Sequence, residues 1–305
     1  MAGRQVNVRD AEAAAVREIW AALRLPGIID VHTHFMPKSV MDKVWDYFDS
    51  TGPLVGRRWP IIYRDDESQR VQTLRGFGVL RFTALVYPHK PKMAAWLNQW
   101  AVDFARSTPD CLATATFYPE PGAGDYVADA IRAGIRVFKA HVQVGGYDPN
   151  DPLLDAVWSA LEDAGTPVVI HCGSGPVPGE HTGPEPIRRL LRRHPRLALI
   201  IAHMGMPEYA EFLDICLDSA RVRLDTTMAF TPFVNEAMPF PVSEHPRLRD
   251  AGDRILFGSD FPNIPYGYRD AMTAITRLPG VDDEWLRGVF YRNAARLFAI
   301  ESDSG

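Results

Sequence analysis

The sequence predicts an α/β fold, a (β/α)8 TIM barrel that forms a single domain over residues 1–305, with an N-terminal helix and a long insertion after the first strand. Short apolar runs recur eight times, stretches with helical periodicity lie between them, and the length suits one barrel. Strands that alternate with helices favour a parallel sheet, and eight repeats favour closure. An open doubly wound sheet is the alternative, but no glycine-rich phosphate turn follows the first strand.

The predicted strands are short segments rich in Val, Ile, Leu and Phe. They lie at residues 27–34, 79–86, 112–117, 135–140, 167–171, 197–202, 222–224 and 254–257. Helical periodicity, often preceded by Pro, Asp or Gly, indicates helices between them at 94–107, 125–133, 153–164, 186–193 and 207–218. No low-complexity tract or change in composition indicates a second domain.

Two segments flank the first predicted strand. Before it, residues 10–24 have the period of an amphipathic helix, which Asp10 opens and Pro26 follows. After it, more than forty residues pass before the next strand. Loops of this length are uncommon unless they are functional, and this one is rich in aromatic and cationic residues, namely Trp45, Tyr47, Phe48, Arg57, Arg58, Trp59 and Tyr63.

Composition and charge narrow the class of protein. A formal net charge of −5 offers no basic stripe for nucleic acid, so the expected partner is a small-molecule substrate. The N-terminus has no apolar signal core, and no run of about 18 apolar residues could cross a membrane. We therefore expect a cytoplasmic protein with no nucleic-acid or membrane partner. The three cysteines, Cys111, Cys172 and Cys216, have no metal-binding spacing and suit buried, unpaired positions.

Polar residues stand at the ends of several apolar runs. In a (β/α)8 barrel the active site lies at the carboxyl ends of the strands, so these residues are informative. The first run ends in His32 and His34, which a strand turns to the same face, where two imidazoles can hold one metal ion. Other runs end in Lys139 and His141, in His171, in His203 and in Asp260. We expect these side chains to converge at the mouth of the barrel.

These residues also have structural interpretations. His141 could hydrogen-bond a loop, and Asp260 could cap a following helix. His171 and His203 end strongly apolar runs, where an imidazole without a partner is costly, so a ligand or acid/base role is favoured for both.

The chain resembles the amidohydrolase superfamily, specifically the amidohydrolase-2 branch of metal-dependent hydrolases and aminocarboxymuconate-semialdehyde-type decarboxylases. The resemblance extends over nearly the whole chain and rests on six motifs: IIDVHTH (28–34), VFKAH (137–141), VVIHCG (168–173), LIIAHMG (199–205), ILFGSDFP (255–262) and RNAARLF (292–298). Each motif is short, but their order and spacing around eight strands are specific.

The resemblance implies the roles of particular residues. One divalent metal ion would be surrounded by His32, His34, His171 and Asp260, and His203 would act beside the reacting group. Lys139 is ambiguous, because in binuclear members of the superfamily a fourth-strand lysine is carbamylated and bridges two metals. We favour a single ion with Lys139 as an electrostatic or substrate-contacting catalytic residue, and the binuclear site with carbamylated Lys139 is the alternative.

Three imidazoles and one carboxylate suit zinc and also fit manganese, iron, cobalt or nickel. Such a metal lowers the pKa of bound water to about 7. Asp260 would orient or deprotonate that water, and His203 would stabilise an oxyanion or protonate a leaving group. This chemistry predicts a metal-dependent hydrolase that acts on an amide, ester or lactone carbonyl of a small, cyclic or aromatic substrate.

The same ligands support an alternative, a metal-dependent non-oxidative decarboxylase of an aromatic or muconate-like acid. In that reaction Asp260 or His203 would deliver a proton to the carbon that loses carbon dioxide. A barrel that has lost turnover and serves as a binding protein is disfavoured, because every expected polar position is filled.

Two further expectations concern the substrate and the assembly. Arg57 or Arg58 is either a carboxylate clamp or a solvated charge. The resemblance implies a homodimer. A flat apolar substrate is suggested by the aromatic residues that follow the first three strands, Trp45, Trp59, Tyr63, Tyr87, Phe117 and Tyr118.

Overall fold

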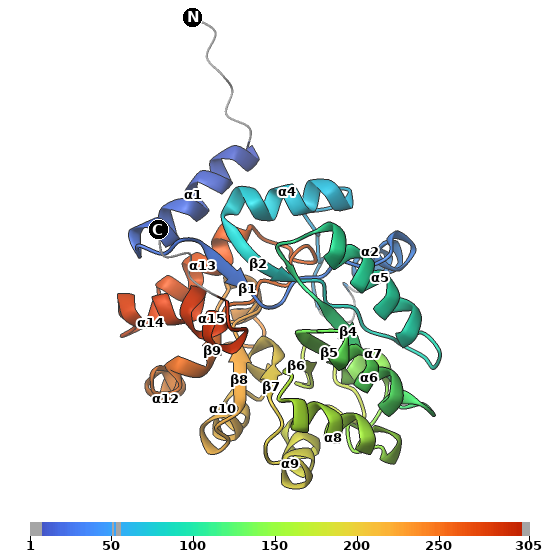
Figure 1. Cartoon of the computed structure of the whole chain (residues 1–305). Helices are drawn as coiled ribbons and strands as arrows, with labels where there is room; N and C mark the ends of the chain where they lie inside the picture. Colours follow the sequence, from blue (N-terminus) through green and yellow to red (C-terminus); the bar gives the residue numbers. More distant parts are fainter. Residues whose placement is uncertain (1–7, 51, 53–55, 301–305) are drawn as a thin grey trace, which may run out of the picture.

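The computed structural model of the chain describes residues 8–50, 52 and 56–300. Strands lie at its centre and helices surround them (Figure 1). The strands pair in parallel in chain order, in the ladders β1-β2-β3 and β4 to β9. They are β1 (Ile28–Asp30), β2 (Val79–Thr83), β3 (Cys111–Leu112), β4 (Thr114–Thr116), β5 (Val137–His141), β6 (Val168–His171), β7 (Leu199–Ile201), β8 (Val222–Asp225) and β9 (Ile255–Leu256).

The two ladders join at both ends. β3 and β4 are parts of the third predicted strand, which is interrupted at Ala113. On the other side, Val31 N donates to Phe257 O at 3.0 Å and Asp260 N donates to His32 O at 2.8 Å, so the segment after β1 lies beside the segment after β9. The molecule is therefore a (β/α)8 TIM barrel, and the predicted fold class is confirmed.

The connection between β1 and β2 differs from the long loop that the sequence predicts, because it contains α2 (Lys38–Ser50) and α4 (Glu67–Phe77). The Asp66 side chain caps α4 by accepting a hydrogen bond from Gln69 N, and Gly78 ends it with φ of 81°. In the described part of the insertion, helices α2 and α4 thus lie outside the strands (Figure 1).

The five helices predicted between the strands are α5 (Ala94–Ser107), α6 (Ala123–Arg132), α8 (Asp155–Ala164), α9 (Pro184–Arg193) and α10 (Tyr209–Asp218), and their ends differ from the prediction by at most two residues. The N-terminal helix is α1 (Val8–Ala22). The remaining helices are α7 (Val142–Gly145), α11 (Pro232–Asn235), α12 (His245–Asp250), α13 (Tyr268–Thr276), α14 (Asp283–Arg287) and α15 (Asn293–Leu297), with short turns η1 (Pro152–Leu154), η2 (Ala202–Gly205), η3 (Val242–Glu244), η4 (Gly252–Arg254) and η5 (Gly288–Arg292).

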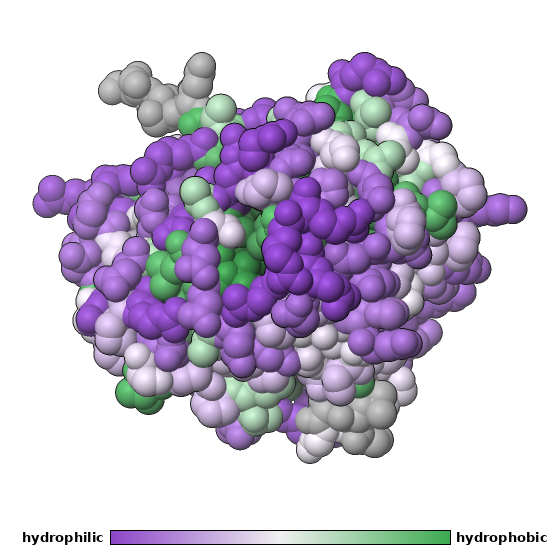
Figure 2. Space-filling model, turned by 90° about the horizontal axis from the view of Figure 1, so that it is seen from below, coloured by the Kyte–Doolittle hydropathy of each residue, from purple (hydrophilic) through white to green (hydrophobic). Residues whose placement is uncertain are grey.

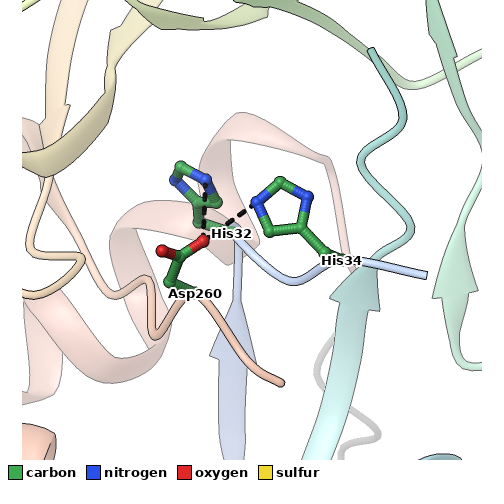
Figure 3. A group of neighbouring side chains, drawn as sticks. All are labelled: His32, His34 and Asp260. Atoms are coloured by element: carbon green, nitrogen blue, oxygen red, sulfur yellow. Dashed lines mark ion pairs between the residues drawn. The ribbon is translucent and has the colours of Figure 1, made fainter. Parts of the chain in front are cut away.

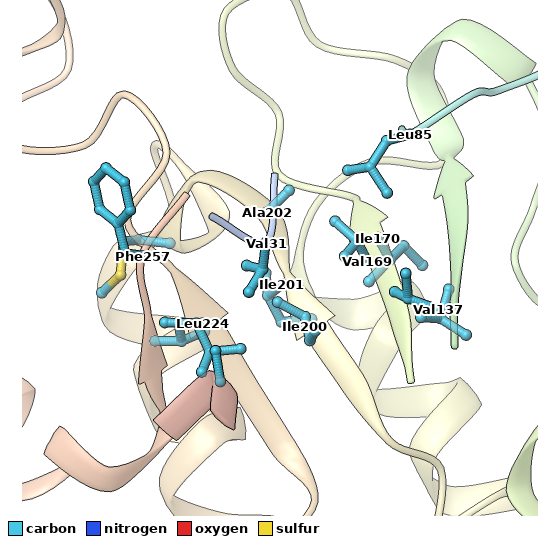
Figure 4. Packing of buried hydrophobic residues seen from close by; sticks show 14 of the residues in the cluster. Val31, Leu85, Val137, Val169, Ile170, Ile200, Ile201, Ala202, Leu224 and Phe257 are labelled. Carbon is cyan, nitrogen blue, oxygen red and sulfur yellow. The ribbon is translucent and has the colours of Figure 1, made fainter. Parts of the chain in front are cut away.

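Aliphatic side chains from successive strands fill the core. Val137, Ile170, Ile200 and Leu224 come from β5 to β8, and each is fully buried (Figure 4). Burial of such side chains from water stabilises each by about 1.5–3 kcal/mol. Because this packing fixes the strands, it also fixes the positions at which their carboxyl ends present polar residues.

The outside of the molecule is largely hydrophilic on the side that carries α9 (Figure 2). The arginines of α9 form ion pairs there, namely Arg188 with Asp214, Arg189 with Asp148, Arg192 with Glu185 and Arg193 with Asp155. Throughout the described ranges, every helix is too short or too polar to cross a membrane.

A series of hydrogen bonds connects α1 with β1. Glu12 Oε1 accepts from the Tyr63 hydroxyl at 2.8 Å, the Tyr63 hydroxyl accepts from Tyr268 N at 2.7 Å, and the Tyr268 hydroxyl donates to Asp30 Oδ2 at 2.9 Å. Three elements distant in sequence, α1, the insertion and α13, are thereby fixed to the strand that leads into His32.

Candidate active site

His32 and His34 lie just beyond the end of β1, in an extended segment whose Thr33 forms a parallel bridge with Phe261. The Thr33 hydroxyl donates to Thr83 O on β2, whereas both histidines line a cavity. The predicted alternation of side chains is therefore kept, although the regular strand ends earlier than expected.

Outer partners orient both imidazoles. His34 Nδ1 lies 2.8 Å from Leu85 O, and His32 Nδ1 lies 2.9 Å from Asp225 Oδ2. A carbonyl and a carboxylate only accept, so each Nδ1 carries the proton and each Nε2 keeps a lone pair. Partners of this kind fix the tautomer and orientation of histidines that bind metals.

The two Nε2 atoms converge on one carboxylate oxygen. Asp260 Oδ1 lies 2.9 Å from His34 Nε2 and 3.7 Å from His32 Nε2 (Figure 3). Lone pairs at such distances repel one another unless a proton or a cation lies among them. One ligand atom from each of these three buried residues lies within 4.8 Å of the other two. This cluster therefore fits a divalent metal ion.

A strained backbone presents Asp260 to the histidines. Its φ of 69° is left-handed, which is uncommon for residues other than glycine and recurs at functional sites. The next helix, α13, begins only at Tyr268, so Asp260 is not a helix cap. Its neighbour Ser259 donates through Oγ to Asp30 Oδ2 at 2.6 Å, and His32 N donates to Asp30 Oδ1 at 3.1 Å. Asp30 thus joins the two backbone segments that carry the cluster.

Asp30 and Asp225 hold residues of the candidate site, and neither is among the site residues predicted from the sequence. Both are fully buried at strand ends. Burial raises the pKa of Asp30 to about 7, although hydrogen bonds from Ser259 and Tyr268 lower it. Asp225 follows the predicted strand 222–224 directly. The rule applied to the other runs, that polar residues at strand ends are informative, would have found it.

The remaining histidines form a row next to the cluster. The His171 ring stacks on His141 with centroids 4.1 Å apart, and it lies 4.7 Å from the ring of His203. His171 Nε2 lies 3.1 Å from Gly175 O and so carries a proton, which leaves Nδ1 as its unprotonated nitrogen. His171 is not one of the three residues whose ligand atoms converge, and its role as fourth ligand stays a prediction.

His141 and His203 differ in their partners. His141 Nδ1 accepts a hydrogen bond from Val144 N at 3.3 Å, so its side chain caps the N-terminus of α7 and does not bond a loop as considered from the sequence. His203 follows β7 in the turn η2 with φ of 56°, and its N donates to Asp225 Oδ1 at 2.9 Å. His203 Nδ1 is buried and has no hydrogen-bond partner among the described residues. The residue His203 also lines the cavity into which the cluster opens.

Burial keeps four imidazoles of the site neutral, those of His32, His141, His171 and His203. It lowers the pKa of His32, His141 and His203 well below the ordinary value and that of His171 to about 3, and the positive charge of Lys139 adds to the effect. Neutral imidazoles are the form that binds metals.

Lys139 lies fully buried beside the cluster. Its Nζ is 3.3 Å from His32 Nε2. Burial lowers the pKa of this amine to about 8, against the raising effect of the Asp225 and Asp260 carboxylates. A lowered pKa increases the fraction of neutral amine, which is the form that a carbamate requires.

The cluster opens into a cavity of about 770 Å³. Of the aromatic residues predicted to contact substrate, Trp59 and Tyr87 line it, together with Tyr47 and Phe48 of the insertion. The others do not line it: Trp45, Tyr63, Phe117 and Tyr118. Trp45 donates to Asn263 Oδ1 at 3.1 Å, and Tyr63 belongs to the series of hydrogen bonds below the site.

Neither arginine considered as a carboxylate clamp lines this cavity. Arg57 pairs with Glu236 at 2.6 Å and lies 3.8 Å over the ring of Phe233, and Arg58 is exposed. Through these two contacts, Arg57 connects the insertion with α11 and the residue that follows it.

Comparison with known proteins places the chain in a family. The model of the amidohydrolase family matches residues 29–300. The chain belongs to the amidohydrolase family. No curated protein matches the sequence of this amidohydrolase.

Solved structures share the fold of this amidohydrolase. An uncharacterised TIM-barrel protein from Bordetella bronchiseptica is 19% identical with a TM-score of 0.72, over 90% of this chain and 98% of that one. A 5-carboxyvanillate decarboxylase from Novosphingobium aromaticivorans, complexed with manganese and 4-hydroxy-3-methoxy-5-nitrobenzoic acid, is 14% identical with a TM-score of 0.61, over 90% and 97%. A probable 2-pyrone-4,6-dicarboxylic acid hydrolase from Acinetobacter baumannii is 16% identical with a TM-score of 0.58, over 90% and 100%.

Proposed function

We propose that this chain is a metal-dependent hydrolase that acts on an amide, ester or lactone carbonyl of a small cyclic or aromatic substrate. The observation that supports it most is the convergence of His32 Nε2, His34 Nε2 and Asp260 Oδ1 in a buried cluster. We propose one divalent ion there, zinc in the first place, with His171 as a further ligand and Lys139 unmodified. When bound, the ion supplies Lewis-acid polarisation of a carbonyl oxygen and acidifies water.

Asp260, His203 and Lys139 have different roles in this proposed reaction. Asp260 accepts the proton of the attacking water at a carboxylate oxygen and returns it to the leaving nitrogen or oxygen. Because burial lowers the pKa of His203 well below its ordinary value, this residue serves as a neutral donor to the developing oxyanion and not as an imidazolium. Lys139 adds a positive charge or a hydrogen bond beside the same oxygen.

Non-oxidative decarboxylation of an aromatic acid is the second candidate. It is favoured by the aromatic side chains of the cavity, Phe48, Trp59 and Tyr87, which suit a flat ring. In this reaction the carbon–carbon bond to the carboxylate breaks, carbon dioxide leaves, and Asp260 delivers to the ring carbon a proton that it has taken up from solvent, while neutral His203 only donates a hydrogen bond.

The experiment is turnover of the metal-loaded protein in ¹⁸O-water with a panel of lactones, aryl esters, cyclic amides and aromatic acids. We expect ¹⁸O in the product carboxylate, and we expect Asp260→Asn to remove turnover while most of the metal is retained. Asp253→Asn, at an exposed carboxylate outside the cavity, is the control and should keep full activity. Release of carbon dioxide without ¹⁸O uptake would exclude hydrolysis. Near-full activity of the Asp260→Asn variant would show that Asp260 is not the base.

A further inference from the structure

Lysine is rare in this chain and gathers at one place. The sequence contains 28 arginines and five lysines. Four of these lysines line the cavity that opens from the metal cluster: Lys43, Lys90, Lys92 and Lys139. The fifth, Lys38, pairs with Asp42 along α2, and its side chain is 87% exposed.

The four lysines occupy two depths of the cavity. Lys139 is fully buried beside the metal cluster. Lys43 on α2 and Lys90 and Lys92 in the connection from β2 to α5 are exposed, as the side chains at a cavity mouth are. Two different segments of the chain therefore bring three ammonium groups to the outer end of the cavity.

One carboxylate outside the cavity lining lies near these three lysines, that of Glu120, whose Oε2 accepts a hydrogen bond from the backbone N of Lys92 at 2.5 Å. Among the residues that the structure describes, Lys43, Lys90 and Lys92 form no ion pair, and the one acidic residue in the lining is Asp260 of the metal cluster. The chain as a whole carries a formal charge of −5. A local excess of positive charge at a cavity mouth attracts anions and raises their rate of association.

Apolar side chains form much of the rest of the wall. Trp59, Met206 and Met228 are buried, and Tyr47 and Trp96 are 47% and 48% exposed. The cavity thus offers a metal cluster at its buried end, apolar walls, and ammonium groups together with the exposed Tyr47 and Trp96 at its outer end. This order of surfaces fits a molecule with a reacting group at one end, a flat apolar body and an anion at the other end.

We propose that Lys43, Lys90 and Lys92 form an anion-binding rim that selects substrates with a carboxylate at the end opposite the reacting bond. The inference rests on the proposed function, which defines the end that reaches the metal. A flexible ammonium group can follow a carboxylate that swings at the mouth, whereas the planar guanidinium of arginine favours one fixed geometry.

The test uses probes that carry a metal-chelating hydroxamate, which fixes their orientation. The probes are benzohydroxamate, 4-carboxybenzohydroxamate and a longer 4′-carboxybiphenyl hydroxamate. Binding to the metal-loaded protein is measured by calorimetry at low ionic strength. We expect a carboxylated probe to bind wild type about tenfold more tightly than benzohydroxamate, because three exposed ion pairs each contribute a few-fold. The triple variant Lys43→Gln, Lys90→Gln, Lys92→Gln should lose this preference and bind benzohydroxamate as before.

Lys38→Gln is the matched control, since it removes the remaining lysine from the same helix as Lys43 and should keep the preference. The proposed rim would be contradicted if the triple variant still preferred a carboxylated probe. It would also be contradicted if the wild type showed no preference. Failure of benzohydroxamate itself to bind would count against the metal centre. Binding of terephthalate to the metal-free chain tests the rim independently of the metal centre. The same triple replacement should weaken this binding.

Discussion

Asp225 does not line the cavity, but its carboxylate accepts hydrogen bonds from three groups of the site. His32 Nδ1 donates to Oδ2 at 2.9 Å, and His203 N and Thr227 N donate to Oδ1 at 2.9 and 3.1 Å. One buried carboxylate therefore sets the tautomer of a candidate metal ligand and the backbone position of the candidate oxyanion donor.

Replacement of Asp225 by Asn tests this role. The amide weakens the partner of His32 Nδ1, and loss of such an outer partner lowers metal affinity by about 10–100-fold. Calorimetric titration of the metal-free protein with Mn²⁺ or Zn²⁺ measures the change, and circular dichroism checks that the variant is folded. An unchanged affinity in a folded Asp225→Asn variant would show that the carboxylate does not tune the metal site.

The candidate site residues are partly predictable from the sequence. His32, His34 and Asp260 end apolar runs, and their ligand atoms converge in one cluster. Asp30 was hidden inside an apolar run, where its sequence neighbours give no indication of Ser259 or Tyr268 as partners. Contacts between distant segments are the part of the site that a local pattern does not contain.

At the scale of elements, threonine side chains join the end of β1 to β2. Thr83 Oγ1 accepts from Thr33 N at 3.1 Å and lies 3.1 Å from Val31 O. Both threonines are fully buried, so no water replaces these bonds. The segment between the two histidines is thereby held against the neighbouring strand.

Thr83→Val keeps the shape of the side chain and removes its hydroxyl. Thr33 N then lacks its partner in a buried position, which costs about 1–3 kcal/mol of the free energy of unfolding. Urea denaturation of the metal-free protein measures it, and Thr83→Ser, which restores the hydroxyl, should recover most of the loss. Equal midpoints for Thr83→Val and wild type would contradict the assigned bond.

Elements were predicted well where their pattern was long and less well where it was interrupted. The helix at 94–107 is reproduced as α5, because its apolar period is unbroken. The insertion reads as a loop in the sequence because more than forty residues pass before the next apolar run. The same segment contains α4, whose start at Asp66 and end at Gly78 are ordinary capping signals.

At the scale of the molecule, the candidate metal ligands come from both ends of the barrel sequence. His32 and His34 follow β1, and Asp260 follows β9. A metal ion held by all three would connect the first and last strands, at the junction where Asp260 N already donates to His32 O. Metal binding and closure of the barrel should therefore be coupled.

Thermal unfolding with and without a chelator measures this coupling. A ligand that binds only the folded state at 100 times its Kd stabilises it by about 2.7 kcal/mol, so Zn²⁺ or Mn²⁺ should raise the Tm by several degrees. His34→Ala should lose the shift, as should His171→Ala if it is the fourth ligand. His181→Ala, outside the cavity, should keep it. An equal shift in all three variants would mean that the ion binds elsewhere.

The hydrogen bonds from Glu12 through Tyr63 and Tyr268 to Asp30 have a practical consequence for any shortened form of this protein. A gene trimmed to begin at the first strand would encode every side chain of the cavity and still omit the outermost partner of this series. Its product would have no acceptor for the proton of the Tyr63 hydroxyl and a less firmly held α13. The smallest active version should therefore retain the leading helix, even though no atom of that helix lines the cavity.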